Sequence, residues 1–274
     1  MLEKLVREAT EYAKSSPLNY IPKDNTYSEA YEGIRIWEDP VICVADASDP
    51  LFETLKDPNV LHPDAMMPKD WIPDAKSVVS FFLPFNRVIK EDNAADLKKA
   101  SELWMLGSSL GQIFIADLSR HLVAFLQENG YEAVAPAVDK RLKMAGPQRS
   151  GWSERHIAYV CGQGTFGMSR GLITEKGIAG RFGSLVTNAP MTVTQRKYSS
   201  PFEYCIQCGA CQRNCPGDAI DMERGFSLAK DNAICGQTLG ALCAPYQRED
   251  RPHYHCCGKC QVGVPCAYGI PKKA

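Results

Sequence analysis

The run CIQCGACQRNCP at residues 205–216 constrains this chain more than any other stretch. Cys205, Cys208 and Cys211 follow one another at intervals of three residues, and Cys215 stands four residues later, directly before a proline. The spacing C-x2-C-x2-C-x3-C-P is typical of bacterial 4Fe–4S proteins, in which the fourth cysteine binds the other cluster when two are present. The run therefore predicts at least one iron–sulfur cube.

The alternatives to an iron–sulfur cluster are a zinc site and disulfides. Zinc sites usually pair two C-x-x-C units across a longer gap, whereas here three cysteines share one unbroken run. Disulfides are typical of secreted chains, but the first residues, MLEKLVREATEYAKSS, form a charged amphipathic pattern without the apolar core of an export signal. We therefore expect a reducing, cytoplasmic environment, and an anaerobic one because exposed cubes are oxygen-labile.

Enough cysteines follow the motif for a second cluster. Each cube takes four thiolates, and ten of the 12 cysteines lie after position 200. Cys43, by contrast, lies in an apolar segment, where a small buried side chain is the usual role of a cysteine. The cysteines beyond the motif are Cys235, Cys243, Cys256, Cys257, Cys260 and Cys266.

The overall composition excludes some classes of partner. The net charge of −1 provides no strongly basic surface for nucleic acid or an anionic membrane. Apolar residues make up 45% of the chain, and no apolar run reaches the length of a membrane span. A length of 274 residues allows one or two domains with an ample core.

Hydrophobic patterns predict a mixture of helices and strands. Residues 2–15 have one apolar helical face, 41–47 and 77–85 are apolar strand-like runs, 94–129 are helical, and 131–138 form another strand. Two glycines inside the long helix indicate either close packing or a break.

A helix and a glycine-rich segment follow. Residues 152–161 have a helical pattern with Ser153 at the N-terminal cap. The basic loop before it, at 139–151, is either solvated or covers a ligand with anionic groups. Residues 171–174 and 181–188 are predicted as two strands of one hairpin. The chain thus divides into an α+β domain at 1–197 and a small cluster domain at 198–274.

Four segments together follow the pattern of a known family. They are IPDAKSVVSFFLPF at 72–85, SERHIAYVCGQGTFG at 153–167, RGLITEKGIAGRFGSLVTNAPM at 170–191, and CIQCGACQRNCPGDAI at 205–220 with DNAIC and CGKCQ behind it. In this order they resemble epoxyqueuosine reductases and the catalytic part of corrinoid-dependent reductive dehalogenases. The resemblance implies a nitroreductase-like α/β domain that holds a base-off corrinoid, followed by a bacterial two-cluster (2×4Fe–4S) ferredoxin-like domain.

The resemblance also implies which cysteines bind which cluster. One cluster would be held by Cys205, Cys208, Cys211 and Cys266, and the other by Cys215, Cys235, Cys257 and Cys260. Cys243 and Cys256 then remain without a role as ligands, and an exchange of Cys256 for Cys257 is the main alternative.

The same resemblance implies a corrinoid pocket lined by residues 152–174 and 181–190. Its cofactor-binding residues would be Arg155, Gly162, Gly164, Thr165, Gly167, Leu172, Ile173, Thr174 and Thr187. The candidate catalytic residues are Glu154, His156 and Tyr159, which share one predicted helix. Glu154 could instead be an ion pair or a helix-end charge, and His156 could be structural.

Three departures from the family limit what can be transferred. Gln148 is the nearest equivalent of the aspartic acid that epoxyqueuosine reductases use as proton donor, so that acid is missing or moved. The helical-repeat tail that those enzymes use for tRNA does not follow the last cysteine, so we do not expect a tRNA substrate. The export signal of the dehalogenases is also absent, which argues against respiratory dehalogenation.

The four other histidines are predicted to be structural. Of these, His62 and His121 lie in the first domain, whereas His253 and His255 are close to the cysteines and could tune the clusters through hydrogen bonds to sulfur.

The resulting hypothesis is a cytoplasmic iron–sulfur oxidoreductase. A ferredoxin or flavodoxin would donate single electrons, two 4Fe–4S clusters would carry them, and a corrinoid (cobalamin) would use them to reduce a small-molecule substrate. Two alternatives stay open. One is an electron-transfer protein or reductive activator without a substrate of its own, and the other is an enzyme that uses FMN. A homodimer is expected only by analogy with nitroreductase-like domains.

Overall fold

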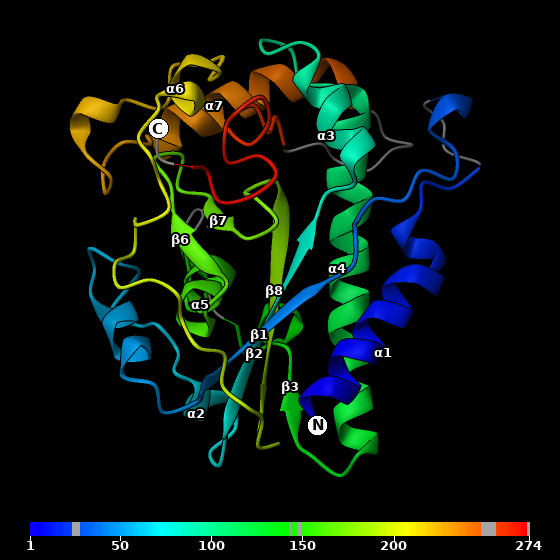
Figure 1. The fold of residues 1–274 in the computed structure, drawn as a ribbon, viewed down its shortest axis with the longest axis vertical. Coiled ribbons are helices and arrows are strands. Elements are labelled where there is room, and N and C mark those ends of the chain that lie inside the picture. Colours follow the sequence, from blue (N-terminus) through cyan, green and yellow to red (C-terminus); the bar gives the residue numbers. More distant parts are fainter. Residues whose placement is uncertain (24–27, 143, 147–148, 248–255, 273–274) are drawn as a thin grey trace.

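A four-stranded antiparallel sheet forms the centre of the molecule (Figure 1). The structure is a computed structural model that describes residues 1–23, 28–142, 144–146, 149–247 and 256–272. β2 and β8 pair along their whole length and occupy the middle of the sheet, where β2 is buried throughout. The strand order is β1-β2-β8-β3, with the bounds Val41–Asp46, Ser77–Pro84, Gly180–Thr187 and Ala133–Val134.

Two short hairpins and seven α-helices complete the regular elements of the described residues. The hairpins are β4 (Met144–Gly146) with β5 (Arg149–Ser150), and β6 (Gly164–Phe166) with β7 (Leu172–Thr174). The helices are α1 (Leu2–Ser15), α2 (Pro68–Trp71), α3 (Arg87–Ala94), α4 (Glu102–Glu128), α5 (Glu154–Cys161), α6 (Ala210–Arg213) and α7 (Asn232–Cys243). This composition confirms the predicted α+β class. Within the described part of the chain, no helix combines the length and apolarity needed to cross a bilayer.

The long helix α4 covers one face of the sheet, with α1 and α3 packed against it. Side chains alternate along β2, so that Phe81 and Leu83 enter the core below α4 while Val78 faces the opposite side. α4 runs unbroken through Gly111, whose missing side chain makes room for Trp37: an added Cβ would lie 2.5 Å from the indole ring. The glycines of this helix therefore mark close packing, one of the two predicted alternatives.

The opposite face of the sheet is covered by α5, which contacts β1, β2 and β8. Trp71 and Trp152 pack edge to face here, with ring centroids 5.9 Å apart. α5 is therefore the element through which the sheet supports the predicted catalytic residues.

The predicted hairpin of residues 171–174 and 181–188 is wrong. β7 pairs with β6, and β8 pairs with β2 and β3 instead. A bridge between Thr174 and Gly177 turns the chain sharply after β7. The eight residues of β8 then match the eight of β2, which buries far more apolar surface than a pairing with the three-residue β7.

Two other predicted elements are shorter than expected. The helix predicted at 94–129 begins only at Glu102, because the Asp96 carboxylate accepts the backbone N–H groups of the following turn and Ser101 caps the new helix. The strand predicted at 131–138 is limited to Ala133–Val134, since Pro136 has no N–H for a ladder and starts a 3-10 turn.

The cysteine-rich C-terminal part lies at the end of the sheet where β8 begins (Figure 1). It is tied to the first part by backbone hydrogen bonds from Phe166 N to Pro201 O at 2.7 Å and from Ile178 N to Cys266 O at 2.9 Å. Lys259 adds a third connection. Its wholly buried ammonium donates to Asn93 Oδ1 and to Asp96 O, both at 2.7 Å, which fastens the last cysteine loop to the end of α3.

Candidate functional site

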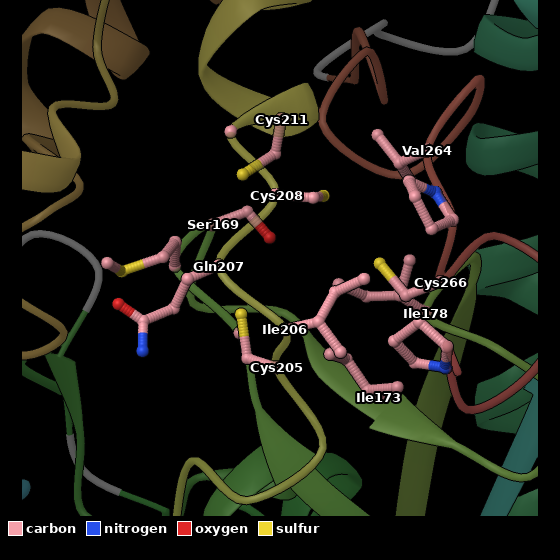
Figure 2. A pocket seen from close by; sticks show the side chains of 15 residues that line it. Ser169, Ile173, Ile178, Cys205, Ile206, Gln207, Cys208, Cys211, Val264 and Cys266 are labelled. Atoms are coloured by element: carbon pink, nitrogen blue, oxygen red, sulfur yellow. The ribbon is translucent and has the colours of Figure 1, made fainter. Parts of the chain in front are cut away.

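Four cysteines line one pocket at the surface end of the C-terminal part (Figure 2). They are Cys205, Cys208, Cys211 and Cys266, the predicted ligands of the first cluster, and we call this site the sulfur pocket. Left-handed backbone at Gln207 (φ 53°) and Gly209 (φ 71°) curls the loop so that three cysteines close in sequence face the same space. The cavity between these side chains has a volume of about 30 Å³.

Electrostatics show that these sulfurs influence one another. Burial, together with the neighbouring Cys211, Cys205 and Cys208, raises the pKa of Cys266 to about 12. Burial likewise raises the pKa of Cys211 to about 11. Four thiolates at such close range are unfavourable unless cations separate them, which is what the irons of a cube provide. The donor set and its enclosure therefore fit a 4Fe–4S cluster.

A second set of thiols lies next to the first. Burial raises the pKa of Cys260, Lys230 lowers it, and Cys235, Cys215 and Cys256 also raise it. Burial, together with Cys260, Cys256 and Cys235, raises the pKa of Cys257 to about 12. We call Cys215, Cys235, Cys257 and Cys260 the second thiol group. Within the described residues, no three His, Cys, Asp or Glu side chains are arranged as ligands of one metal ion.

The two cysteines predicted to be spare have other surroundings. Cys243 is buried beside Met105, with the two sulfurs 3.9 Å apart. Cys256 belongs to the core below α4, where its sulfur accepts from Trp104 Nε1 at 3.1 Å and from Arg181 at 2.9 Å. These hydrogen bonds tie the Cys256 sulfur to α4 and β8, which favours Cys257 as the cluster ligand.

The three predicted catalytic residues do not converge on one point. Glu154 turns toward the sheet, and in the described residues neither of its buried carboxylate oxygens has a hydrogen-bond partner of good geometry. Burial raises the pKa of Glu154 to about 7, although the nearby Ser184 hydroxyl, which accepts from Trp152 Nε1 at 2.8 Å, holds it down. Of the three, Glu154 is the group that titrates near neutral pH.

His156 and Tyr159 share a different side of α5. Their rings lie 5.0 and 6.0 Å from that of Phe166, which makes a half-buried aromatic surface. Desolvation, aided by Arg155 and Arg170, lowers the pKa of His156 to about 4, so the imidazole is neutral at pH 7. Its Nδ1 lies 2.8 Å from the Ser153 hydroxyl, which is why that serine occupies the N-cap position without capping the helix.

The predicted cofactor-binding residues are divided among several environments. Arg155 is exposed, and its guanidinium donates to Arg170 O at 2.5 Å. Gly167 and Ile173 line the sulfur pocket, where a Cβ on Gly167 would lie 3.9 Å from the Cys205 sulfur. These two residues thus stand beside the first cluster site.

The other predicted residues of β6 and β7 support that hairpin. Gly164 is required for the pairing, because a Cβ there would lie 1.9 Å from Ile173 O. Thr165 Oγ1 accepts from Tyr204 N at 2.9 Å, and Thr174 Oγ1 donates to Gly177 O at 2.8 Å. Leu172 is buried beside them. These side chains hold the wall of the sulfur pocket in place.

Gly162 and Thr187 lie outside this group. Gly162 ends α5 in a left-handed conformation (φ 97°). Thr187 is at the far end of β8 from Gly180, a strand of roughly 23 Å at 3.3 Å per residue. The hydroxyl of Thr187 donates to Glu132 O at 2.6 Å, so a structural role accounts for it.

Sequence patterns did not single out three cations near α5. Arg170, Arg181 and Lys230 come from separate segments, and each interacts electrostatically with Arg155. Arg170 has a left-handed backbone (φ 58°), a feature that cannot be recognised from the sequence.

Three residues named in the sequence analysis, Gln148, His253 and His255, lie outside the described residues. Of the two other histidines, His121 pairs with Glu8 at 2.7 Å and His62 lies 3.6 Å from Asp64, consistent with structural roles.

Comparison with known proteins supports the predicted 4Fe–4S region and shows which solved structures have a similar fold. The 4Fe-4S binding domain family matches residues 201–221. No curated protein sequence matches the chain. Among solved structures, epoxyqueuosine reductase from Streptococcus thermophilus superimposes with a TM-score of 0.53 at 16% identity, over 85% of this chain and 63% of that one.

Two further structures show the same similarity. Epoxyqueuosine reductase from Bacillus subtilis gives a TM-score of 0.52 at 17% identity, over 99% of this chain and 68% of that one. The catabolic reductive dehalogenase NpRdhA, in complex with 3-bromo-4-hydroxybenzoic acid, gives 0.51 at 13% identity, over 98% of this chain and 37% of that one. At these identities the similarity shows a shared fold, and at that level the predicted resemblance is confirmed.

Proposed function

We propose that the protein is an oxidoreductase that passes electrons through two 4Fe–4S clusters to an acceptor bound beside α5. The observation that carries this proposal is the sulfur pocket, in which four cysteines line one space, with Cys260 of the second thiol group acting on Cys211 beside it. Cys208 is the exposed member of the sulfur pocket, whereas all four cysteines of the second thiol group are half-buried.

The two thiol groups are close enough for electrons to pass between them. Among the neighbouring charges that raise the pKa of Cys211 in the sulfur pocket, Cys260 of the second thiol group comes first. Electrons from a ferredoxin or flavodoxin would therefore enter at Cys208 and leave from the second thiol group. Arg155 on α5 interacts with Cys260, which supports an acceptor on the side of this helix.

A corrinoid in a nitroreductase-like first domain is the acceptor that we propose. The half-buried rings of His156 and Tyr159, tilted by 46° and 40° against that of Phe166, provide aromatic contacts of the kind that a corrin or a flavin uses. A bound corrinoid supplies a strongly reducing cobalt centre for removing oxygen or halide from a small molecule. The protein's own residues would orient it and exclude water, while Glu154, with a pKa of about 7, would hold a proton nearby.

Anaerobic reconstitution with iron and sulfide tests the proposal. We expect about eight irons per chain and two interacting reduced clusters by EPR. Titration with cobalamin and, separately, with FMN then identifies the acceptor. Retention of neither cofactor, with both clusters present, would leave an electron-transfer protein or reductive activator. A content of about four irons would contradict the division of the cysteines.

A further inference from the structure

A wholly buried lysine lies between two cysteines of the second thiol group. Lys259 is 0% exposed, and it is one residue from Cys260 and two residues from Cys257. A lysine is almost never fully buried unless its charge is paired, because taking an ammonium ion out of water is costly. The burial of this side chain therefore calls for a compensating negative charge.

The hydrogen bonds of Lys259 show that it is protonated. Its Nζ donates to Asn93 Oδ1 and to Asp96 O, both at 2.7 Å, and also to Asn93 O. Three acceptors require the three N–H groups of an ammonium ion, since a neutral amine has only two. The site therefore holds a full positive charge.

The acceptors of Lys259 do not neutralise this charge, because all three are carbonyl oxygens of neutral groups. In the described residues, no carboxylate oxygen lies within ion-pair distance of its ammonium group. Asp96 offers only its backbone, while its exposed carboxylate accepts Lys98 N and Lys99 N at 2.8 and 3.1 Å. The buried charge is thus hydrogen-bonded but has no protein carboxylate beside it in the described part of the chain.

The surrounding contacts fix the lysine beside the second thiol group. Asn93 Nδ2 donates to Cys257 O at 3.0 Å, so one side chain contacts both the ammonium group and the backbone of a predicted ligand. Gly258 packs so closely on Trp104 that an added Cβ would lie 2.2 Å from the indole ring. The ammonium group lies within about 10 Å of the Cα of Cys260, the sum of one Cα–Cα step and an extended lysine side chain.

We propose that Lys259 is the buried counter-charge of the second cluster and raises its reduction potential. A cube bound by four thiolates is an anion that becomes more negative with each electron it accepts. A fixed ammonium group in a dry interior favours the more negative state, because charges interact strongly where water is excluded. This inference rests on the proposed function, because it requires a cluster at the second thiol group. Lys259 would act on that cluster from outside its ligand set.

The rival explanation is that Lys259 only fastens its loop to α3. Fastening needs hydrogen bonds but no charge, and an amide side chain could supply them. The hydrogen bond from Asn93 to Cys257 and the packing of Gly258 on Trp104 already hold this loop in place. The two explanations differ in what they predict for the reduction potential.

EPR-monitored redox titration of the iron–sulfur-loaded protein tests the counter-charge. Lys259→Met and Lys259→Gln remove the charge, whereas Lys259→Arg keeps it. We expect each neutral variant to shift the reduction equilibrium of the second cluster at least about tenfold toward the oxidised state, which is about 59 mV for one electron. The potential of the first cluster should change less, and Lys259→Arg should keep a potential close to that of the wild type.

Two controls separate the effect of the charge from the position of the loop. Asn93→Ala removes the hydrogen bonds to Cys257 and Lys259 without changing any charge. Lys4→Met removes a positive charge from the exposed face of α1. Neither should lower the potential of the second cluster tenfold. An equal shift in Asn93→Ala and Lys259→Met, or an unchanged potential in both neutral variants, overturns the inference.

Iron content covers the case in which both neutral variants lose the second cluster. Retention of about eight irons in Lys259→Arg would then show that the cluster needs the charge, which supports the inference. Loss of the second cluster in all three variants would show that only the shape of the lysine matters, which overturns it.

The inference and the proposed function fail separately. If about eight irons bind and neither potential responds to the charge of Lys259, the counter-charge is wrong and the electron path stands. If the wild type binds only about four irons and Cys260→Ser keeps them all, no second cluster exists and the proposed function is wrong.

Discussion

The sulfur pocket and the second thiol group each contain four cysteines, but the charges around these cysteines differ. The sulfur pocket is lined by apolar side chains such as Ile173, Ile178 and Val264, and its Cys208 is exposed. The second thiol group faces Lys230 and Arg155, which interact with Cys260. Nearby cations favour the reduced, more negative state of a cluster, so the difference predicts that electrons flow from the sulfur pocket to the second thiol group.

The largest expected effect is the loss of one cluster while the other is kept. Cys260→Ser should lose the cluster of the second thiol group and keep about four irons in the sulfur pocket. Cys266→Ser should do the reverse, because its sulfur lines the sulfur pocket. Iron analysis and EPR of the reduced proteins distinguish the two spectra. Cys243→Ser, which alters a thiol buried beside Met105, is the matched control and should keep both clusters.

The same measurement decides between two adjacent cysteines. Cys257→Ala should lose a cluster, whereas Cys256→Ala should keep both and lose only the contacts with Trp104 and Arg181. If only Cys256→Ala loses iron, Cys256 is the cluster ligand in place of Cys257.

A smaller but still large effect concerns the wall of the sulfur pocket. Gly164→Ala places a Cβ against Ile173 O, so we expect a loss of about 3 kcal/mol in the free energy of unfolding and a damaged β6–β7 hairpin. Denaturant titration and EPR check both. The control is Gly240→Ala on α7, where an added Cβ meets nothing within 4 Å and should stabilise by about 0.5–1 kcal/mol. If Gly164→Ala disturbs the second cluster as much as the first, the two sites are not independent.

The distinction between the two thiol groups could be predicted only in part from sequence. The C-x2-C-x2-C-x3-C-P run groups Cys205, Cys208 and Cys211 because they are local, whereas Cys266, which lines the same pocket, is 51 positions after Cys215 and was expected only from the resemblance. The interaction of Arg155 with Lys230 could not be predicted, because the two residues are 75 positions apart and interact only after the chain folds. Likewise Cys256 and Cys257 are neighbours whose roles differ only through packing.

The prediction of the strand pairing was wrong because this pairing is also non-local. The run at 181–188 was identifiable as a strand, but its partner β2 begins about a hundred residues earlier, and local patterns do not encode such a non-local pairing. On α5, the periodicity placed Glu154, His156 and Tyr159 on one helix but did not reveal that Glu154 turns to the sheet while His156 and Tyr159 meet Phe166.

A pH test sharpens the comparison by asking whether the positive charge of Arg155 influences the carboxyl group of Glu154, its neighbour on α5. Burial raises the pKa of Glu154 from 4.5 to about 7, so its folded state binds extra protons between these values. Its stabilising contribution is complete below about pH 4.5 and is lost as the pH rises through about 7. From pH 6.5 to 8 we expect the free energy of unfolding to fall by about 1 kcal/mol, and Glu154→Gln to abolish that part of the fall.

This pH window avoids the opposite contribution of His156. Its pKa is lowered to about 4, so its stabilising effect is lost only as the pH falls from 6.5 toward 4. Urea denaturation at pH 6.5 and 8 measures both proteins. If Glu154→Gln leaves the pH dependence unchanged, the Glu154 carboxyl is already ionised at pH 6.5. That result would mean that a nearby cation such as Arg155 stabilises the carboxylate.

The smallest expected effect is a shift in reduction potential. Lys230→Gln removes one cation from the second thiol group and should lower the potential of that cluster by less than about 1 kcal/mol, or roughly 40 mV for one electron. The matched control is Lys197→Gln, whose exposed ammonium pairs with Glu175 at 2.7 Å and should move neither potential. EPR-monitored redox titration resolves the two clusters. A shift confined to the second cluster supports the direction of flow inferred from its cations, because their removal brings the two potentials closer together. An equal shift of both clusters would mean that Lys230 acts on the molecule as a whole, and the contrast between the sites would then rest on solvent exposure alone.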